Sequence, residues 1–128
     1  AVSGKRIILI DDSIVRGTTC AHIVQLLRDA GAKEGHMRIS SPPFLHPCYF
    51  GTDIDSTDNL IAAHHTVEEI GKIIGADSIG FLSLEACDKL AVGSHCGFCK
   101  ACFSGEYPVK PPKAGRKLKF ETRLSEKE

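Results

Sequence analysis

The chain has 128 residues, of which 42% are hydrophobic and 25% are charged, so it is long enough for one domain with an apolar core. Its 16 basic and 16 acidic residues cancel, which argues against a nucleic-acid partner. The sequence contains neither the roughly 20 apolar residues of a membrane helix nor a signal-peptide pattern. We therefore expect a cytoplasmic protein without membrane contact.

The first predicted element is a strand formed by the apolar run Ile7, Ile8, Leu9 and Ile10. Apolar and polar residues do not alternate here, and β-branched residues dominate. This pattern predicts a strand of a parallel sheet that is buried on both faces. Ligands of open α/β sheets bind beyond the carboxyl ends of the strands. We therefore expect the functional residues to begin directly after this strand.

The loop over residues 11–19 begins with two adjacent carboxylates, Asp11 and Asp12, and leads into a helix. A helix N-terminus offers free N–H groups and a partial positive charge to an anion. Gly17 permits a close approach of the backbone, and the loop hydroxyls add hydrogen bonds. The carboxylates suit vicinal hydroxyls or a hydrated Mg²⁺. The loop thus predicts a phosphate site beside a sugar or Mg²⁺ site; its hydroxyl residues are Ser13, Thr18 and Thr19.

The elements after this loop alternate between helices and strands, which is typical of an α/β fold with a mostly parallel sheet flanked by helices. A helix with apolar residues at three- and four-residue spacing ends at Gly31, and another begins with the capping-box pair Thr66 and Glu69 and ends at Gly75. The predicted helices cover residues 20–30, 67–74 and 84–92, the predicted strands cover residues 36–40 and 78–83, and residues 59–63 form a short helical turn.

Two segments lack periodicity. Residues 44–58 carry aromatic, Pro, Gly and Asp residues and are predicted to form an irregular loop. Residues 110–128 are rich in Pro and then charged, with seven basic and three acidic residues. We expect a domain over residues 1–109 and a disordered basic tail over residues 110–128.

Six cysteines in a cytosolic chain argue against a disulfide framework. Cys20 and Cys87 lie in predicted helices, where we expect them to pack. Cys96, Cys99 and Cys102 are each separated by two residues, a spacing that suits zinc or an iron–sulfur cluster. The spacing does not choose between these metals, and reduced thiols without a metal remain the alternative.

Four stretches resemble one family. The sequence IILIDDSIVRGTT resembles the phosphoribosyl pyrophosphate (PRPP) loop of type I phosphoribosyltransferases. Within these enzymes it is most similar to the glutamine PRPP amidotransferases. Three further stretches match that family: ISSPPFLHPCYFGTDI at residues 39–54, IGADSIGFLSLE at 74–85 and CKACFSGEYPV at 99–109.

The resemblance implies the first step of de novo purine synthesis, in which PRPP, glutamine and water give 5-phosphoribosylamine, glutamate and pyrophosphate. It places PRPP on the loop, with Asp11 and Asp12 also holding Mg²⁺. It also implies purine nucleotide effectors and a homo-oligomer. The substrate-binding residues by this resemblance are Asp11, Asp12, Ser13, Ile14, Val15, Arg16, Gly17, Thr18 and Thr19.

The resemblance also bears on the cysteines, because cluster-bearing members hold a 4Fe-4S cluster. Their pattern matches Cys48, Cys99 and Cys102, while the fourth family ligand falls upstream of this chain. Cys96 departs from the pattern, and it either replaces the fourth ligand, binds zinc or has no role.

Compared with the family, the chain resembles a carboxy-terminal part of the phosphoribosyltransferase domain. It lacks the N-terminal glutaminase domain and the first half of the phosphoribosyltransferase domain. We expect no turnover by this part alone. Two alternatives remain: a module that binds a phosphoribosyl group or a nucleotide without turnover, or a structural fragment without a ligand.

Overall fold

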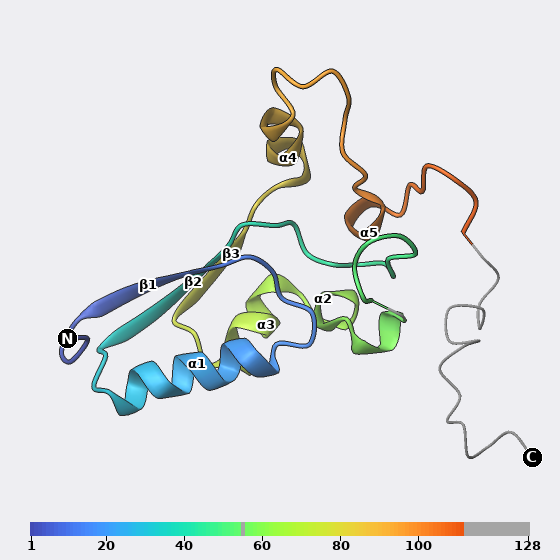
Figure 1. The fold of residues 1–128 in the computed structure, drawn as a ribbon. Coiled ribbons are helices and arrows are strands. Elements are labelled where there is room, and N and C mark those ends of the chain that lie inside the picture. Colours follow the sequence, from blue (N-terminus) through green and yellow to red (C-terminus); the bar gives the residue numbers. More distant parts are fainter. Residues whose placement is uncertain (55, 112–128) are drawn as a thin grey trace, which may run out of the picture.

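A three-stranded parallel sheet forms the centre of the computed structural model, which describes residues 1–54 and 56–111 (Figure 1). The strands lie in the order β1 (Arg6–Asp11), β2 (Glu34–Ile39) and β3 (Ser78–Phe81). Asp11 pairs with Ile39, and Ile39 pairs with Phe81. The carboxyl ends of the three strands therefore meet at one edge of the sheet, and the predicted parallel α/β fold is confirmed.

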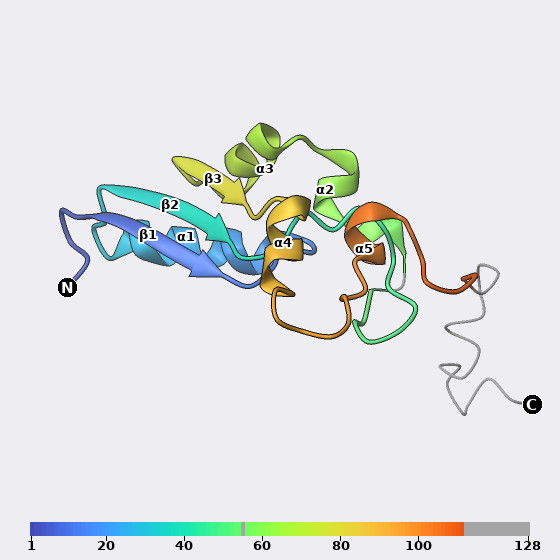
Figure 2. The same cartoon turned by 90° about the horizontal axis from the view of Figure 1, so that it is seen from above.

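Two helices, α1 (Thr18–Asp29) and α3 (Val67–Ile74), cover the same face of this sheet (Figure 1). The view from above shows that α4 (Leu84–Leu90) and α5 (Ala101–Ser104) lie beyond the carboxyl ends of the strands (Figure 2). A short 3₁₀ turn, η1 (Thr57–Asn59), and α2 (Ile61–His64) precede α3. The predicted helices are present within a few residues of their expected bounds, but α5 was not predicted.

The main core lies between the sheet and the two helices. Met37 and Ile39 of β2 are 1% and 3% exposed, and they pack with Val24 of α1 and with Ile70 and Ile74 of α3. The buried residues follow the period of their own element: they lie at every second position in the strand and at every third or fourth position in the helices. The periodicity of the sequence therefore identifies the covered face of each element.

The predicted capping box at the start of α3 is confirmed. The Thr66 hydroxyl oxygen accepts a hydrogen bond from the backbone N–H of Glu69, while the Glu69 carboxylate accepts one from the backbone N–H of Thr66. These contacts satisfy donors that a helix start leaves without an intrahelical partner. Gly75 ends the helix in the left-handed conformation, with a φ of 75°.

The prediction that the first strand is buried on both faces is wrong for the described part of the chain. Ile8 and Ile10 of β1 are 66% and 75% exposed. Both helices that pack on the sheet lie on its other face, so the side chains that alternate away from them meet no covering element among the described residues.

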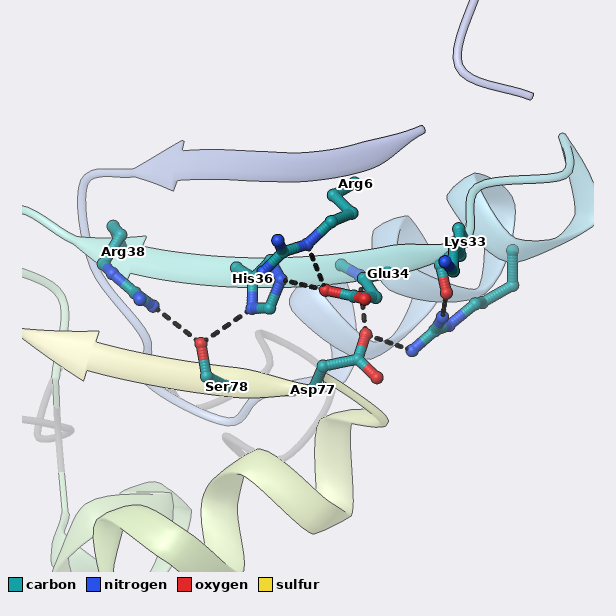
Figure 3. Close-up of polar contacts among 9 residues, drawn as sticks. Arg6, Lys33, Glu34, His36, Arg38, Asp77 and Ser78 are labelled. Atoms are coloured by element: carbon teal, nitrogen blue, oxygen red, sulfur yellow. Dashed lines mark hydrogen bonds and ion pairs between the residues drawn. The ribbon is translucent and has the colours of Figure 1, made fainter. Parts of the chain in front are cut away.

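A polar network runs across this second face of the sheet (Figure 3). Arg6 and His36 both contact the Glu34 carboxylate, and the other ring nitrogen of His36 lies 2.9 Å from the Ser78 hydroxyl oxygen. Arg38 donates to the same hydroxyl at 3.1 Å. Hydrogen bonds from His36 and Arg6 lower the pKa of Glu34. The network thus links all three strands.

The segment after β2 is irregular, as predicted, and it packs around a second apolar cluster. Phe44, Ile54 and Leu60 are its buried members, and Val15 and Phe103 pack against them. Among the described residues, no helix combines the length and the apolarity needed to cross a bilayer. Most of the predicted basic tail, residues 112–128, lies outside the described residues.

Candidate functional site

A pocket of about 450 Å³ lies where β1 ends and α1 begins. Consecutive residues of the loop line it, together with one carboxylate from a distant segment. Asp53 is that carboxylate, and the loop members are Asp11, Asp12, Ser13, Ile14, Val15, Arg16, Gly17, Thr18, Thr19 and Cys20. The structure therefore brings every predicted loop residue to one concave site at the carboxyl edge of the sheet.

Apolar side chains and backbone hydrogen bonds hold this loop in place. Ile14 is 2% exposed and belongs to the main core. The backbone oxygen of Val15 accepts a hydrogen bond of 2.8 Å from the N–H of Ile61. The Ile14 side chain and the Val15 backbone therefore anchor the loop to the core and to α2.

Gly17 turns the loop into α1. Its φ of 81° lies in the left-handed region, which favours glycine. A Cβ atom at this position would lie 2.9 Å from Cδ1 of Ile61, so the core leaves no room for a side chain. Gly17 is thus required by both its backbone conformation and its packing.

The start of α1 lines the pocket through Gly17, Thr18 and Thr19. In the described structure no side chain caps this helix start, and the carbonyl of Gly17 accepts the N–H of Ala21 at 2.9 Å. Thr18 and Thr19 are exposed beside it, as is Arg16. Free N–H groups, hydroxyls and a guanidinium are the donors that a phosphate group requires.

The two carboxylates of the loop have different surroundings. Oδ1 of Asp11 accepts the backbone N–H of Asp12 at 2.9 Å, and Oδ2 of Asp11 accepts a hydrogen bond from the Cys20 thiol at 3.6 Å. Asp12 is exposed, and its Oδ1 accepts the Ser13 hydroxyl at 2.9 Å. Asp11 is therefore tied to the protein on both oxygens, whereas Asp12 is tied only to its neighbour.

Cys20 is 3% exposed, so the prediction that it packs is confirmed. Burial and the hydrogen bond to Asp11 raise the pKa of this thiol to about 11. The thiol is accordingly protonated at neutral pH and acts as a donor to Asp11.

Ser40 and Asp53 complete the surroundings of the loop. Ser40 donates to the backbone oxygen of Asp11 through both its N–H, at 2.9 Å, and its hydroxyl, at 3.1 Å. Asp53 was not identified from the sequence, because its approach to residues 11–20 depends on tertiary packing of the irregular loop. Its position within the matching stretch at residues 39–54 was the one available signal.

Asp11 and Asp12 fit Mg²⁺ in the number of carboxylates that they supply. Within the described residues, no three His, Cys, Asp or Glu side chains are arranged to hold a single metal ion. Mg²⁺ usually keeps several waters and takes only one or two protein carboxylates together with substrate phosphates. Asp11 and Asp12 supply that number of carboxylates beside a predicted phosphate site.

Three cysteines meet at a second, smaller pocket of about 220 Å³. Cys48 lines it from the irregular loop, while Cys99 and Cys102 line it from the start of α5 and the residues before it. The backbone oxygen of Cys102 accepts the N–H groups of Leu45 and His46, each at 3.0 Å, which fastens the two segments together. In the described structure Cys96 is exposed and does not line this pocket.

The thiols of this second pocket influence one another. Burial and the nearby Cys48 and Cys99 sulfurs raise the pKa of Cys102 to about 11. For Cys48, burial acts to raise the pKa, but the N–H groups of Phe50, Thr52 and Gly51 act against it and hold the pKa below its ordinary value. Three cysteine sulfurs at one pocket are ligands of the kind that iron–sulfur clusters take. A 4Fe-4S cluster binds each thiolate through a different iron, so its ligands need not converge on one point.

Comparison with known proteins shows what this chain is similar to. An amidophosphoribosyltransferase of Archaeoglobus fulgidus is 57% identical over 113 residues, which cover 87% of this chain and 25% of the relative. The amidophosphoribosyltransferase of Bacillus subtilis is 53% identical over 114 residues, covering 85% of this chain and 24% of the relative. No protein-family model matches the chain.

A solved structure agrees with these relatives. Glutamine PRPP amidotransferase from B. subtilis, complexed with ADP and GMP, superimposes with a TM-score of 0.78 and 51% identity over 88% of this chain and 26% of that one. The fold is thus that of a phosphoribosyltransferase domain. More particularly, the chain is a homologue of the amidophosphoribosyltransferases, and it spans about a quarter of their length.

Proposed function

We propose that this chain is the part of an amidophosphoribosyltransferase that carries the PRPP loop. The observation that supports the proposal most is the pocket at the end of β1, which gathers three carboxylates, three hydroxyls and the start of α1. The similar solved enzyme is described as acting on PRPP. Phosphate and vicinal hydroxyls are the groups of PRPP that such a donor and acceptor set recognises.

In this proposal the loop positions PRPP for displacement at C1 of the ribose. N–H groups and hydroxyls from Ser13 to Thr19 hold the 5-phosphate, while Asp11 and Asp12 hold the ring hydroxyls and Mg²⁺. When bound, Mg²⁺ neutralises charge on the departing pyrophosphate. The carboxylates lie near the positive charge that develops on the ribose, so the loop contributes positioning and electrostatic stabilisation without a covalent nucleophile.

The proposed reaction belongs to the full-length protein. Ammonia from glutamine attacks C1, the bond between C1 and the pyrophosphate oxygen breaks, and a C1–N bond forms to give 5-phosphoribosylamine. Glutamine hydrolysis consumes water and leaves glutamate. This reaction requires a glutaminase domain, and we propose that domain, purine nucleotide effectors and further copies of the chain as partners in the cytoplasm. The nucleotides ADP and GMP in the similar structure support the effector proposal.

We further propose that Cys48, Cys99 and Cys102 are ligands of a 4Fe-4S cluster, with the fourth ligand outside this chain or at Cys96. Their shared pocket supports this assignment. The cluster would join the irregular loop to the segment around α5 and so stabilise this end of the domain.

The proposed domain covers residues 1–109, and the proposed basic tail follows it.

A second candidate function applies to the 128-residue chain by itself. Because the chain spans about a quarter of its relatives, the described residues supply the loop side of the site only. Binding of a phosphoribosyl group or a nucleotide without turnover is the function that this part alone supports.

A titration followed by NMR tests the proposed site. PRPP with Mg²⁺ is added to labelled protein, and the amide resonances of Gly17, Thr18 and Thr19 are followed. We expect these resonances to shift with one common dissociation constant. The amide resonance of Gly75 is the control and should stay unchanged, because Gly75 is also in the left-handed conformation but lies at the end of α3, outside the loop. Unchanged loop resonances at saturating PRPP would contradict the proposal.

A further inference from the structure

The buried Cys20 thiol is a polar group for which the proposed reaction has no direct use. It lies in the first turn of α1, nine residues after Asp11, in a residue that lines the same pocket. At 3% exposure it is not placed to meet solvent or to react with it. Within the described residues, its thiol donates a hydrogen bond to Oδ2 of Asp11, at 3.6 Å.

The backbone oxygen and both carboxylate oxygens of Asp11 accept hydrogen bonds. Ser40 donates twice to its backbone oxygen, the N–H of Asp12 donates to Oδ1, and the thiol of Cys20 donates to Oδ2. Each carboxylate oxygen can accept about two hydrogen bonds, so one lone pair on each oxygen stays available. These hydrogen bonds restrict the rotation of the carboxylate and leave one lone pair on each oxygen for a ligand.

Asp12 has no comparable support in the described structure. Its carboxylate is exposed and accepts a hydrogen bond from the Ser13 hydroxyl of the same loop. The two neighbouring carboxylates therefore differ in freedom. A side chain that is fixed before binding loses less conformational entropy when it takes up a ligand.

We propose that Cys20 is a positioning residue that fixes the orientation of Asp11 for the vicinal hydroxyls of a ribosyl ligand. This inference rests on the proposed function of the loop. Cys20 does not touch the substrate; it acts through the carboxylate. The role requires a hydrogen-bond donor at the position of the sulfur. A serine hydroxyl also supplies this donor, whereas an aliphatic side chain does not.

Enzyme kinetics with PRPP test this role in the full-length protein. Cys20→Ala should raise the KM for PRPP by about 3- to 10-fold, the range expected when a side chain must be immobilised on binding, with a smaller change in kcat. Cys20→Ser should restore the KM to within twofold of the wild type. Val24→Ala is the matched control, because Val24 is equally buried on the same helix and its apolar side chain has no hydrogen bond to donate to Asp11. It should lower stability and leave the KM unchanged.

The outcomes separate this inference from the proposed function. If Cys20→Ala leaves the KM within twofold while Asp11→Ala raises it, Cys20 does not position Asp11, although the loop still binds PRPP. An equal rise for Cys20→Ser and Cys20→Ala would also overturn the inference. If Asp11→Ala and Asp12→Ala both leave the KM unchanged, the proposed function fails and this inference fails with it.

A spectroscopic measurement needs neither substrate nor a folded alanine variant at Cys20. The S–H stretching band of Cys20 is identified as the band that Cys20→Ser removes from the Raman spectrum. We expect it at the lowered frequency of a donating thiol, and we expect Asp11→Ala to raise that frequency. A band with the frequency of a free thiol in the wild type would overturn the inference.

Discussion

Gly17 holds the turn between the phosphate loop and α1 through two separate constraints. Its φ of 81° is unfavourable for any side chain, and an added Cβ would lie 2.9 Å from Cδ1 of Ile61. From the sequence, a glycine was expected here because it allows the backbone to approach a phosphate closely. The structure adds that the apolar core behind the loop also excludes a side chain.

Gly17→Ala should therefore destabilise the fold by about 1 to 3 kcal/mol, the usual cost of holding a side chain in a sparsely populated backbone conformation. Urea denaturation measures this cost. Ile61→Val removes Cδ1 and costs about 0.5 to 1.5 kcal/mol by itself. In the Ile61→Val background the cost of Gly17→Ala should be smaller, since the clash is gone and only the backbone strain remains. Strictly additive costs would show that the contact with Ile61 has no influence.

At the scale of whole elements, the sequence predicted what depends on local periodicity. The helices, the two later strands and the Thr66–Glu69 capping box follow from side-chain spacing and end signals, and each is present. The four-residue helix α5 is too short to carry a period. The approach of Asp53 to the loop and the contact of Cys20 with Asp11 join residues through the tertiary fold, so no local pattern reports them.

Asp77 joins three elements just before β3 begins. Its Oδ2 accepts the N–H of Gly35 in β2 at 2.7 Å and also contacts Arg28 of α1. Figure 3 shows Asp77 beside the start of β3. The Gly35 hydrogen bond and the Arg28 guanidinium lower the pKa of Asp77, against the opposing effect of desolvation. A carboxyl whose pKa is lower in the folded state stabilises the fold above its unfolded pKa of about 3.9, and that contribution is lost as the pH falls through the folded pKa.

Asp77→Asn should therefore lower the urea midpoint at pH 7, and the difference from the wild type should shrink as the pH falls below about 4. Asp29→Asn is the control, because among the described residues the Asp29 carboxylate accepts a side-chain hydrogen bond from Gln25, one turn earlier on the same helix, and joins no other element. It should change the midpoint less. A difference between Asp77→Asn and the wild type that is constant from pH 3 to pH 7 would contradict the role of the ionised carboxylate.

At the scale of the whole molecule, the apolar run of the first strand predicted burial without showing what provides it. In the described structure the helices cover one face, and Ile8 and Ile10 remain exposed on the other. An apolar strand indicates that a covering element is needed but does not identify it. The cysteines gave a similar result. The spacing of Cys96, Cys99 and Cys102 indicated a site of sulfur ligands, whereas the resemblance to the family was needed to include Cys48.

The cluster proposal makes a prediction about these cysteines in the full-length protein. After anaerobic reconstitution, Cys99→Ser should lose most of the bound iron and sulfide, because Cys99 shares a pocket with Cys48 and Cys102. Cys96→Ser is the matched control, because Cys96 lies three positions before Cys99 on the same segment but does not line this pocket, and it should lose less. Iron and sulfide analysis with visible absorption measures both. Retention of a full cluster in Cys99→Ser, or its loss only in Cys96→Ser, would show that different thiolates are the ligands.

The assignment of the loop to PRPP is tested most directly by separating the two half-reactions of the full-length protein. Steady-state rates of 5-phosphoribosylamine formation and of glutamine hydrolysis are measured for the wild type and for Asp12→Asn, which keeps the size of the side chain and removes its charge. If the carboxylate holds the ribose and Mg²⁺, the transferase rate should fall by at least about 100-fold, a loss typical of a removed electrostatic contact at a reacting centre, while glutamine hydrolysis persists. A transferase rate within threefold of the wild type would contradict the assignment.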